Sequence, residues 1–241
     1  MAGLIYFAIG DVHGESRKLA DLHTAILDRI AFENAPARII HLGDYVDRGP
    51  DTRGVIERVM ALEKRFADDP AISVISLMGN HEQMLLGAYD SPLPQEAGSW
   101  WSQGGAEAAD SYAGGPGKAD ANWRELIPEA HTNWLRGLGS IHIDMERRLA
   151  FVHAGIDPAR FPDCPEMIRL WTRADRFFNR DNWPAREELE GLTVVHGHTP
   201  RSFQPEILPH RINVDTGACF GGPLTAVMLK PGAAPEFIRA N

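Results

Sequence analysis

Apolar positions in the first ninety residues follow two alternating periods. Apolar, partly β-branched runs at residues 4–9, 38–42 and 72–77 are typical of buried strands. Between these runs, apolar residues recur at helical spacing, at Leu19, Leu22, Ile26 and Ile30 and again at Val55, Val59, Leu62 and Phe66. This alternation predicts βαβ units with parallel strands and right-handed crossovers, followed by a short helix after Asn80.

The second half of the chain is rich in predicted strands. Residues 141–144 and 149–152 flank a short polar turn and predict a hairpin, and further strands are expected at 192–195, 212–214 and 224–229. From about residue 90 to 140, prolines and glycines interrupt any long period, which indicates a loop-rich, partly helical insertion. No linker divides the sequence, so we predict a single α/β domain over residues 1–241, with a layered β-sheet core flanked by helices.

Composition narrows the class of protein. A chain of 241 residues that is 44% hydrophobic can bury a sizeable core, and its net charge of −9 argues against a nucleic-acid surface. No stretch approaches the about 20 apolar residues of a membrane span, and residues 4–9 lack the basic flank of a signal peptide, so we expect a cytoplasmic protein. The two cysteines, Cys164 and Cys219, are expected to stay reduced. No role is assigned to Cys219.

Aspartate, asparagine and histidine stand beside glycine where several predicted strands end. The segments are GDVHG (residues 10–14), GDYVDRG (43–49), GNHE (79–82), HAG (153–155) and, later, HGHTP (196–200). Carboxylate, amide and imidazole groups suit manganese, iron or zinc, and cysteine, the common ligand of structural zinc, is missing from these segments. Two ions about 3.5–4 Å apart activate water and neutralise phosphoryl oxygens. The pattern therefore predicts a two-metal phosphoesterase site.

In order and spacing, these segments resemble the signature blocks of the phosphoprotein phosphatase family of serine/threonine phosphatases, within the calcineurin-like metallophosphoesterases. The match is close to the bacterial and phage lambda branch, and it spans residues 10–217 with GNHEQM (79–84), WTR (171–173), GHTP (197–200) and VDTG (214–217) in the family's order. The resemblance implies a calcineurin-like metallophosphoesterase fold. It also implies a metal-dependent serine/threonine protein phosphatase that hydrolyses phosphomonoesters, with phosphotyrosine and small phosphoesters as further substrates.

The resemblance also implies a role for individual residues. One metal ion would be held by Asp11, His13 and Asp44, and the other by Asp44, Asn80, His153 and His198. A hydroxide between the two ions would attack phosphorus directly. His81 would protonate the leaving oxygen, Asp47 would orient His81, and Arg48 and Arg173 would bind phosphoryl oxygens. Two Mn²⁺ ions are expected, with iron or zinc as alternatives.

Several positions have a structural alternative. His196 and His198 compete for one ligand position, and the family pattern selects His198. Asp215 is interpreted as a turn residue or as a group that orients a ligand histidine, and is not counted as a ligand. The alternative for Arg173 is an ordinary surface arginine. We expect His41 to be a partly buried structural residue, and Trp100 and Trp101 to form a small core within the insertion.

Two other functions remain open at this point. The first is hydrolysis of nucleotides or diadenosine tetraphosphate, whose hydrolases share the GDxHG opening. Because those enzymes characteristically carry alanine at the position of Asp47, this residue favours the phosphomonoesterase. The second is a non-catalytic scaffold, which the complete set of ligand residues disfavours. Phosphorylated proteins or peptides are the expected partners, with no nucleic acid, membrane or inferable regulatory subunit. The insertion is expected to shape the mouth of the site.

Overall fold

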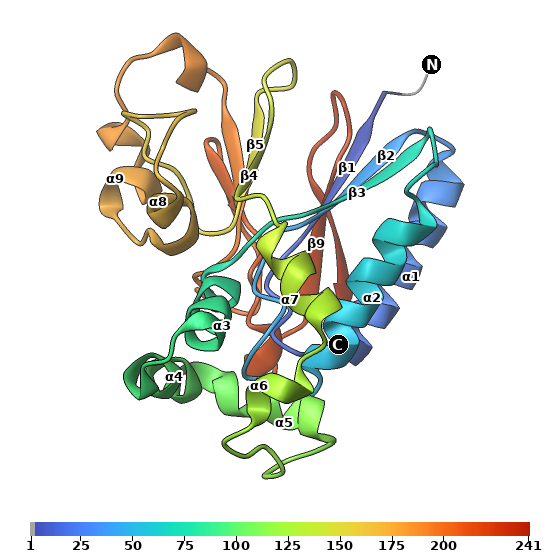
Figure 1. The fold of residues 1–241 in the computed structure, drawn as a ribbon. Helices are drawn as coiled ribbons and strands as arrows, with labels where there is room; N and C mark the ends of the chain where they lie inside the picture. Colours follow the sequence, from blue (N-terminus) through green and yellow to red (C-terminus); the bar gives the residue numbers. More distant parts are fainter. Residues whose placement is uncertain (1–2) are drawn as a thin grey trace.

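Two mixed β-sheets pack face to face in the computed structural model, which describes residues 3–241 (Figure 1). The first sheet has the strand order β10-β9-β1-β2-β3. Its bounds are β1 Ile5–Ile9, β2 Ala37–His41, β3 Ile72–Ser76, β9 Leu224–Leu229 and β10 Glu236–Ala240. β1, β2 and β3 run parallel, as predicted, and β9 is antiparallel to both β1 and β10.

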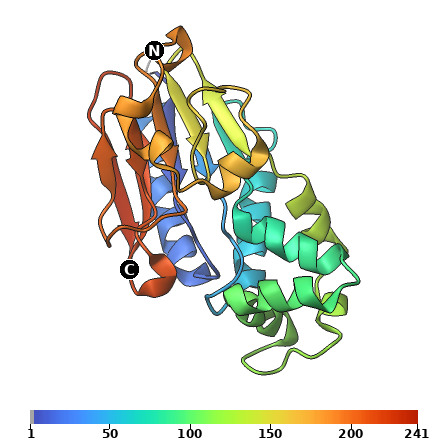
Figure 2. The same cartoon turned by 90° about the vertical axis from the view of Figure 1, so that its left-hand side faces the viewer.

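The second sheet has the order β4-β5-β6-β8-β7. Its bounds are β4 Ile141–Asp144, β5 Leu149–Val152, β6 Thr193–His196, β7 Glu206–Leu208 and β8 Arg211–Asn213. β4 and β5 form the predicted hairpin, while β5, β6 and β8 run parallel to one another. The two sheets are visible as separate layers when the molecule is turned (Figure 2).

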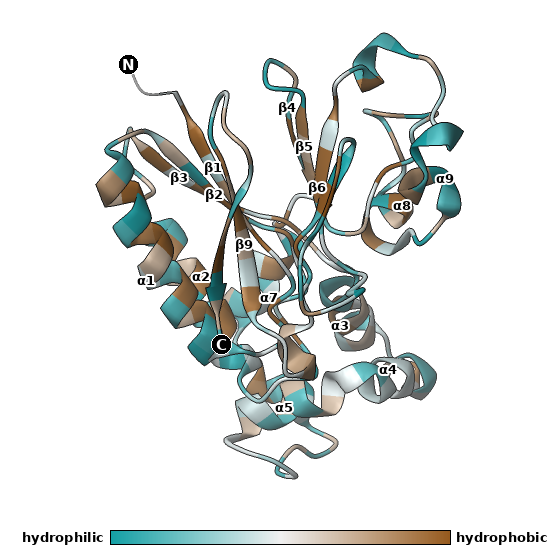
Figure 3. Ribbon diagram, turned by 180° about the vertical axis from the view of Figure 1, so that it is seen from behind, coloured by the Kyte–Doolittle hydropathy of each residue, from teal (hydrophilic) through white to brown (hydrophobic). Residues whose placement is uncertain are grey.

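Alternating side chains of β1 separate two hydrophobic cores. Phe7 and Ile9 point toward α1 (Ser16–Glu33) and α2 (Thr52–Arg65), whose predicted apolar faces lie in the same core. Tyr6 and Ala8 point the other way, into a core shared with the second sheet. The interior strands are accordingly apolar on both faces, as Figure 3 shows for β1 and β2.

A third core covers the outer face of the second sheet. Ala150, Val152 and Val194 of that sheet pack there against Phe161 and Phe177. The covering segment holds α8 (Glu166–Trp171), α9 (Asp175–Phe178) and two 3-10 helices, η2 (Arg180–Asn182) and η3 (Glu187–Leu189). The order of layers is therefore helices, sheet, sheet, helices, which confirms the predicted α/β class.

The insertion is more helical than the sequence predicts. After α3 (Asn80–Asp90) come α4 (Pro94–Trp100), the π-helix η1 (Trp101–Gly105), α5 (Ala106–Ala113), α6 (Trp123–Leu126) and α7 (Glu129–Arg136). Helices of four to eight residues contain too few turns to show a long period, which is why the sequence predicts a loop-rich segment there. Strands β7 and β10 are also absent from the prediction. A last 3-10 helix, η4, spans Ala218–Phe220.

No helix within residues 3–241 is long and apolar enough to cross a membrane. The division of the chain into one domain, 1–241, stays a prediction.

Candidate metal centre

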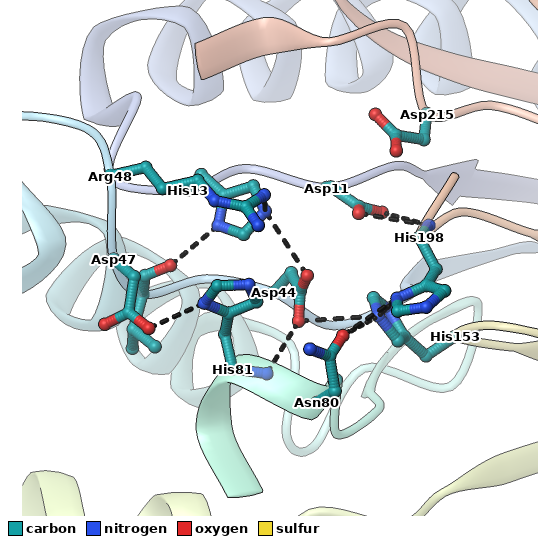
Figure 4. Close-up of polar contacts among 12 residues, drawn as sticks. Asp11, His13, Asp44, Asp47, Arg48, Asn80, His81, His153, His198 and Asp215 are labelled. Atoms are coloured by element: carbon teal, nitrogen blue, oxygen red, sulfur yellow. Dashed lines mark hydrogen bonds and ion pairs between the residues drawn. The ribbon is translucent and has the colours of Figure 1, made fainter. Parts of the chain in front are cut away.

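The predicted ligand segments meet at one edge of the paired sheets (Figure 4). Residues 10–14, 43–49 and 79–82 follow β1, β2 and β3, and the segments with His153 and His198 follow β5 and β6. Because parallel strands end at the same edge of a sheet, their following loops converge there. The sheet packing brings the two sets of loops together.

One group of ligand atoms surrounds His153. Its Nε2 lies 2.9 Å from Asn80 Oδ1 and 3.1 Å from His198 Nδ1, and the latter two atoms are 2.8 Å apart. Asp44 Oδ1 is 3.4 Å from the same Nε2. The other ring nitrogen of His153, Nδ1, is bonded to the carbonyl oxygen of Leu42 at 3.0 Å, so the Nε2 lone pair faces the group. These converging acceptors fit a divalent cation.

A second group forms on the other side of Asp44. His13 Nε2 lies 3.3 Å from Asp44 Oδ2, while His13 Nδ1 donates to the carbonyl oxygen of Val46 at 2.8 Å. His81 supplies the third potential ligand of this group. Since Oδ1 of Asp44 faces His153 and Oδ2 faces His13, one carboxylate connects both groups. The donor set therefore fits two cations that share Asp44.

Asp11 lies beside these groups without belonging to either in this arrangement. Both of its carboxylate oxygens accept from the backbone N–H of His198, at 3.0 and 3.1 Å. Burial raises the pKa of Asp11 well above its usual range, and the charges of Asp215 and Asp44 raise it further. The carboxylate of Asp215 itself accepts a hydrogen bond from the backbone N–H of Gly217 at 3.0 Å. The ligand role of Asp11 stays a prediction.

His81 and Asp47 form a buried pair. His81 Nδ1 lies 2.6 Å from Asp47 Oδ2, and Trp100 Nε1 donates to Oδ1 and Oδ2 of Asp47 at 2.9 and 3.1 Å. Trp100 packs with Trp101 and Trp123, but this cluster is continuous with the large core of β1, α1 and α2 and is not the separate small core predicted for the insertion. The bond of Trp100 to Asp47 is a site contact that the sequence interpretation missed. A buried indole N–H needs an acceptor, which was the available signal.

Both predicted arginines lie near the pair. Arg48 Nη1 is 2.7 Å from His13 Nε2, and the Arg48 backbone N–H donates to the carbonyl oxygen of Gly104 in the insertion at 3.0 Å. Arg173 is exposed just after α8, and its charge contributes to the lowered pKa values of His81 and His198. The site therefore has two cationic groups available to anions at its edge.

Glu82 organises the Asp44 loop and was not singled out from the sequence. Its carboxylate accepts from the backbone N–H groups of Asp44, Tyr45 and Val46 at 2.8, 2.7 and 3.2 Å, and from Gly79 at 2.8 Å. The loop needs this support because Asp44, Asp47 and Arg48 have the left-handed φ values 54°, 72° and 66°. Glutamate at the third position of a helix is a capping-box signal that could have found it.

Burial favours the neutral, metal-binding form of three site histidines. It lowers the pKa of His198 to about 2 and that of His81 to about 3, and it lowers the pKa of His153 as well. Burial alone would raise the pKa of Asp44, but His153, His81 and His13 hold it well below its usual range. Asp44 is thus an anion, and although burial opposes it, this charge raises the pKa of His13 above its usual value.

The structure distinguishes between the alternatives that the sequence left for several residues. His198 converges with His153, whereas the His196 ring packs against Phe177 and has Arg211 Nη1 3.3 Å from its Nε2. His41 is buried away from the ligands and bonded to His23. Cys164 and Cys219 are both free, as predicted.

Comparison with known proteins identifies related sequences. The model of the family described as calcineurin-like phosphoesterase matches residues 6–225. An asymmetrical bis(5'-nucleosyl)-tetraphosphatase of Bacillus mycoides is 30% identical over 92% of this chain and 89% of its own. A symmetrical bis(5'-nucleosyl)-tetraphosphatase of Pectobacterium atrosepticum is 28% identical over 97% of this chain and 73% of its own.

Solved structures share the fold at lower identity. A protein provisionally assigned as a diadenosine tetraphosphatase superposes with a TM-score of 0.64, at 21% identity, over 100% of this chain and 99% of its own. A cold-active protein-tyrosine phosphatase of a Shewanella species gives a TM-score of 0.58 at 20% identity, over 97% of this chain and 81% of its own. At these identities the likeness supports the fold alone.

Proposed function

Since this chain belongs to the calcineurin-like phosphoesterase family, we propose that it is a metal-dependent hydrolase of bis(5'-nucleosyl) polyphosphates. The observation that carries the proposal is the 30% identity, over 92% of the chain, to a bis(5'-nucleosyl)-tetraphosphatase. This support outweighs the single position, Asp47, on which the preference for a phosphomonoesterase rested. Because one relative is asymmetrical and another symmetrical, the proposal names the substrate class and leaves the cleaved bond open.

The donor set accommodates two divalent ions. In the proposal, Asn80, His153 and His198 hold one ion, His13 and Asp11 hold the other, and Asp44 is shared by both. When bound, the ions supply Lewis acidity and lower the pKa of water at the site. Imidazole, amide and carboxylate ligands suit manganese, iron and zinc alike, and we expect manganese.

The other residues bind and orient the substrate. Arg48 and Arg173 neutralise phosphoryl oxygens through planar guanidinium groups. Asp47 accepts from His81 Nδ1, which fixes the ring and stabilises its protonated form while an anionic phosphoryl group is bound. His81 then gives a proton to the leaving oxygen. Trp100 orients Asp47 from the insertion.

A second candidate is phosphomonoester hydrolysis, including phosphoserine and phosphothreonine in proteins. The buried pair of His81 and Asp47 favours it, because an alkoxide leaving group needs a proton more than the less basic phosphate of a nucleotide does. The phosphoprotein phosphatase interpretation thus stays as the alternative to the dinucleotide substrate.

The test compares kcat/KM values after chelation and reconstitution with manganese. Diadenosine tetraphosphate is measured against phosphoserine, phosphothreonine and phosphotyrosine peptides. The proposal expects the dinucleotide to be preferred by tenfold or more, a difference of about 1.4 kcal/mol in transition-state binding. Asp44→Asn protein, prepared in the same way, controls for a contaminating enzyme. A tenfold preference for a phosphopeptide would replace the proposal with the alternative, and absent turnover would favour a scaffold.

A further inference from the structure

Two half-exposed phenylalanines lie over one glycine near the metal centre. Phe203 is 52% exposed and Phe220 58% exposed. A Cβ atom on Gly217 would lie 3.4 Å from Phe203 Cε1 and 3.7 Å from Phe220 Cδ2, so both rings contact the space above this residue. Aromatic rings seldom stay exposed in pairs without a partner, because each buries a large apolar area when covered.

The backbone that carries Phe220 is held firmly. Lys18 Nζ donates to the carbonyl oxygens of Ala218 and Gly222, both at 2.8 Å. Within the loop, the backbone N–H groups of Phe220 and Gly222 donate to Gly217 at 2.9 and 3.0 Å. The exposed ring is therefore presented from an ordered loop, which reduces the entropy cost of binding a ligand there.

The same ring adjoins the proposed phosphate site. The Phe220 ring centroid is 5.5 Å from Cζ of Arg48, and Arg48 Nη1 is 2.7 Å from His13 Nε2. In Figures 1 and 2 the short orange-red helix η4, which ends at Phe220, lies at the same end of the molecule as the insertion helices α4 to α6. A phosphate bound to Arg48 would place its attached nucleoside within reach of the ring.

We propose that Phe203 and Phe220 form a stacking site for a nucleobase of the substrate, whose phosphate binds Arg48. This inference rests on the proposed function, and it adds the residues that recognise the base. Stacking on aromatic rings uses the π-face that every base has, so the site would accept different bases. Larger purines would gain more than pyrimidines, because they cover more apolar area.

The test measures equilibrium binding of adenosine 5'-monophosphate and of ribose 5-phosphate to the manganese-loaded protein by calorimetry. The two probes share a ribose phosphate and differ in the base. Wild-type protein is expected to prefer the nucleotide by about tenfold or more. Phe220→Ala and Phe203→Ala should each reduce the preference at least threefold, whereas Phe220→Tyr should retain it. Phe32→Ala removes a ring that is 81% exposed on α1 and should change nothing.

Two results would overturn the inference: equal affinity of the wild type for both probes, or an unchanged preference in both alanine variants. Because the readout is binding, it is independent of which bond the protein cleaves. A nucleotide preference that depends on Phe220, without turnover of diadenosine tetraphosphate, would refute the proposed function and leave the stacking site standing. Turnover with equal affinities would refute the stacking site alone.

Discussion

The indole nitrogen of Trp100 donates hydrogen bonds to both carboxylate oxygens of Asp47, at 2.9 and 3.1 Å. Asp47 is in turn 2.6 Å from His81 Nδ1. A residue of the helical insertion therefore supports the pair to which we assign proton transfer. The insertion also meets the site through Gly104, whose carbonyl oxygen accepts from Arg48.

Replacing Trp100 by phenylalanine is expected to slow turnover of substrates with poor leaving groups. The variant keeps the aromatic packing but removes the hydrogen bonds to the buried Asp47 carboxyl group, and we expect kcat to fall about tenfold. With p-nitrophenyl phosphate, whose leaving group needs little protonation, the change should be small. Trp101→Phe alters the same aromatic cluster and leaves the bonds to Asp47 in place. Equal losses on both substrates would contradict a role through Asp47.

His81→Asn and Asp44→Asn separate the proton donor from the metal ligands. Loss of a general acid costs about 10²- to 10⁴-fold in turnover, so His81→Asn should be strongly impaired while it retains its metal. Asp44→Asn should lose both activity and metal, since Asp44 faces both groups of ligand atoms. Metal content and kcat are measured on the same preparations. If His81→Asn loses metal, then His81 acts as a ligand, as its place in the second group also allows.

Glu82→Gln tests the support of the Asp44 loop. Glutamine offers one acceptor oxygen, and its NH₂ group would face backbone N–H donors, so the free energy of unfolding should fall by about 2–3 kcal/mol. Metal content should fall too, because Asp44 loses its fixed position. The control is Glu33→Gln, which weakens the ion pairs with Arg29 and Lys230 at the C-terminal end of α1, away from the Asp44 loop. Stability is measured by denaturant unfolding, and metal content is measured on the same preparations. Equal metal content in both variants would contradict the role of Glu82 in holding the Asp44 loop.

Metal should stabilise the fold. Without a cation, the acceptor atoms of Asn80, His153 and His198 face one another. Manganese at 100 times its dissociation constant adds about 2.7 kcal/mol, which corresponds to an increase in Tm of about 5–10 °C for a chain of this size. Calorimetry of chelated and of manganese-reconstituted protein measures this increase in Tm. An equal increase in Asp44→Asn would show that manganese binds elsewhere.

Acidification should destabilise the metal-free protein partly through His23. Burial lowers the pKa of His23 to about 4, so the folded protein holds it neutral beside His41. In the unfolded chain histidine titrates near about 6.5, so this contribution is present above pH 6.5 and is lost as the pH falls toward 4. His23→Gln should flatten the curve by up to about 1.4 kcal/mol per pH unit. The control Thr24→Ala neither adds nor removes a titrating group, so it should leave the slope of stability against pH unchanged. Parallel curves for His23→Gln and wild type would refute this contribution.

The choice of substrate shows where sequence interpretation stopped. The metal-ligand segments are common to phosphatases and to dinucleoside polyphosphate hydrolases, so they identify the chemistry and not the leaving group. The side chains that we assign to substrate recognition, Phe203 and Phe220, come from separate loops. Neither stands in a motif, and only the fold brings Phe203 to Gly217 and so beside Phe220.

Local pattern was sufficient for strands β1 to β6, β8 and β9, for the main helices and for the clustering of the ligand segments. Strand period and the glycines after strands are properties of neighbouring residues, and parallel strands carry those segments to one edge. The tertiary structure alone decided that Glu82 holds the Asp44 loop and that Trp100 bonds Asp47. The sharing of Asp44 by two groups of ligands was already implied by the family resemblance, and its two carboxylate oxygens face His153 and His13. These contacts join residues that are distant in sequence, and their distances depend on how sheets and insertion pack, which no local period encodes.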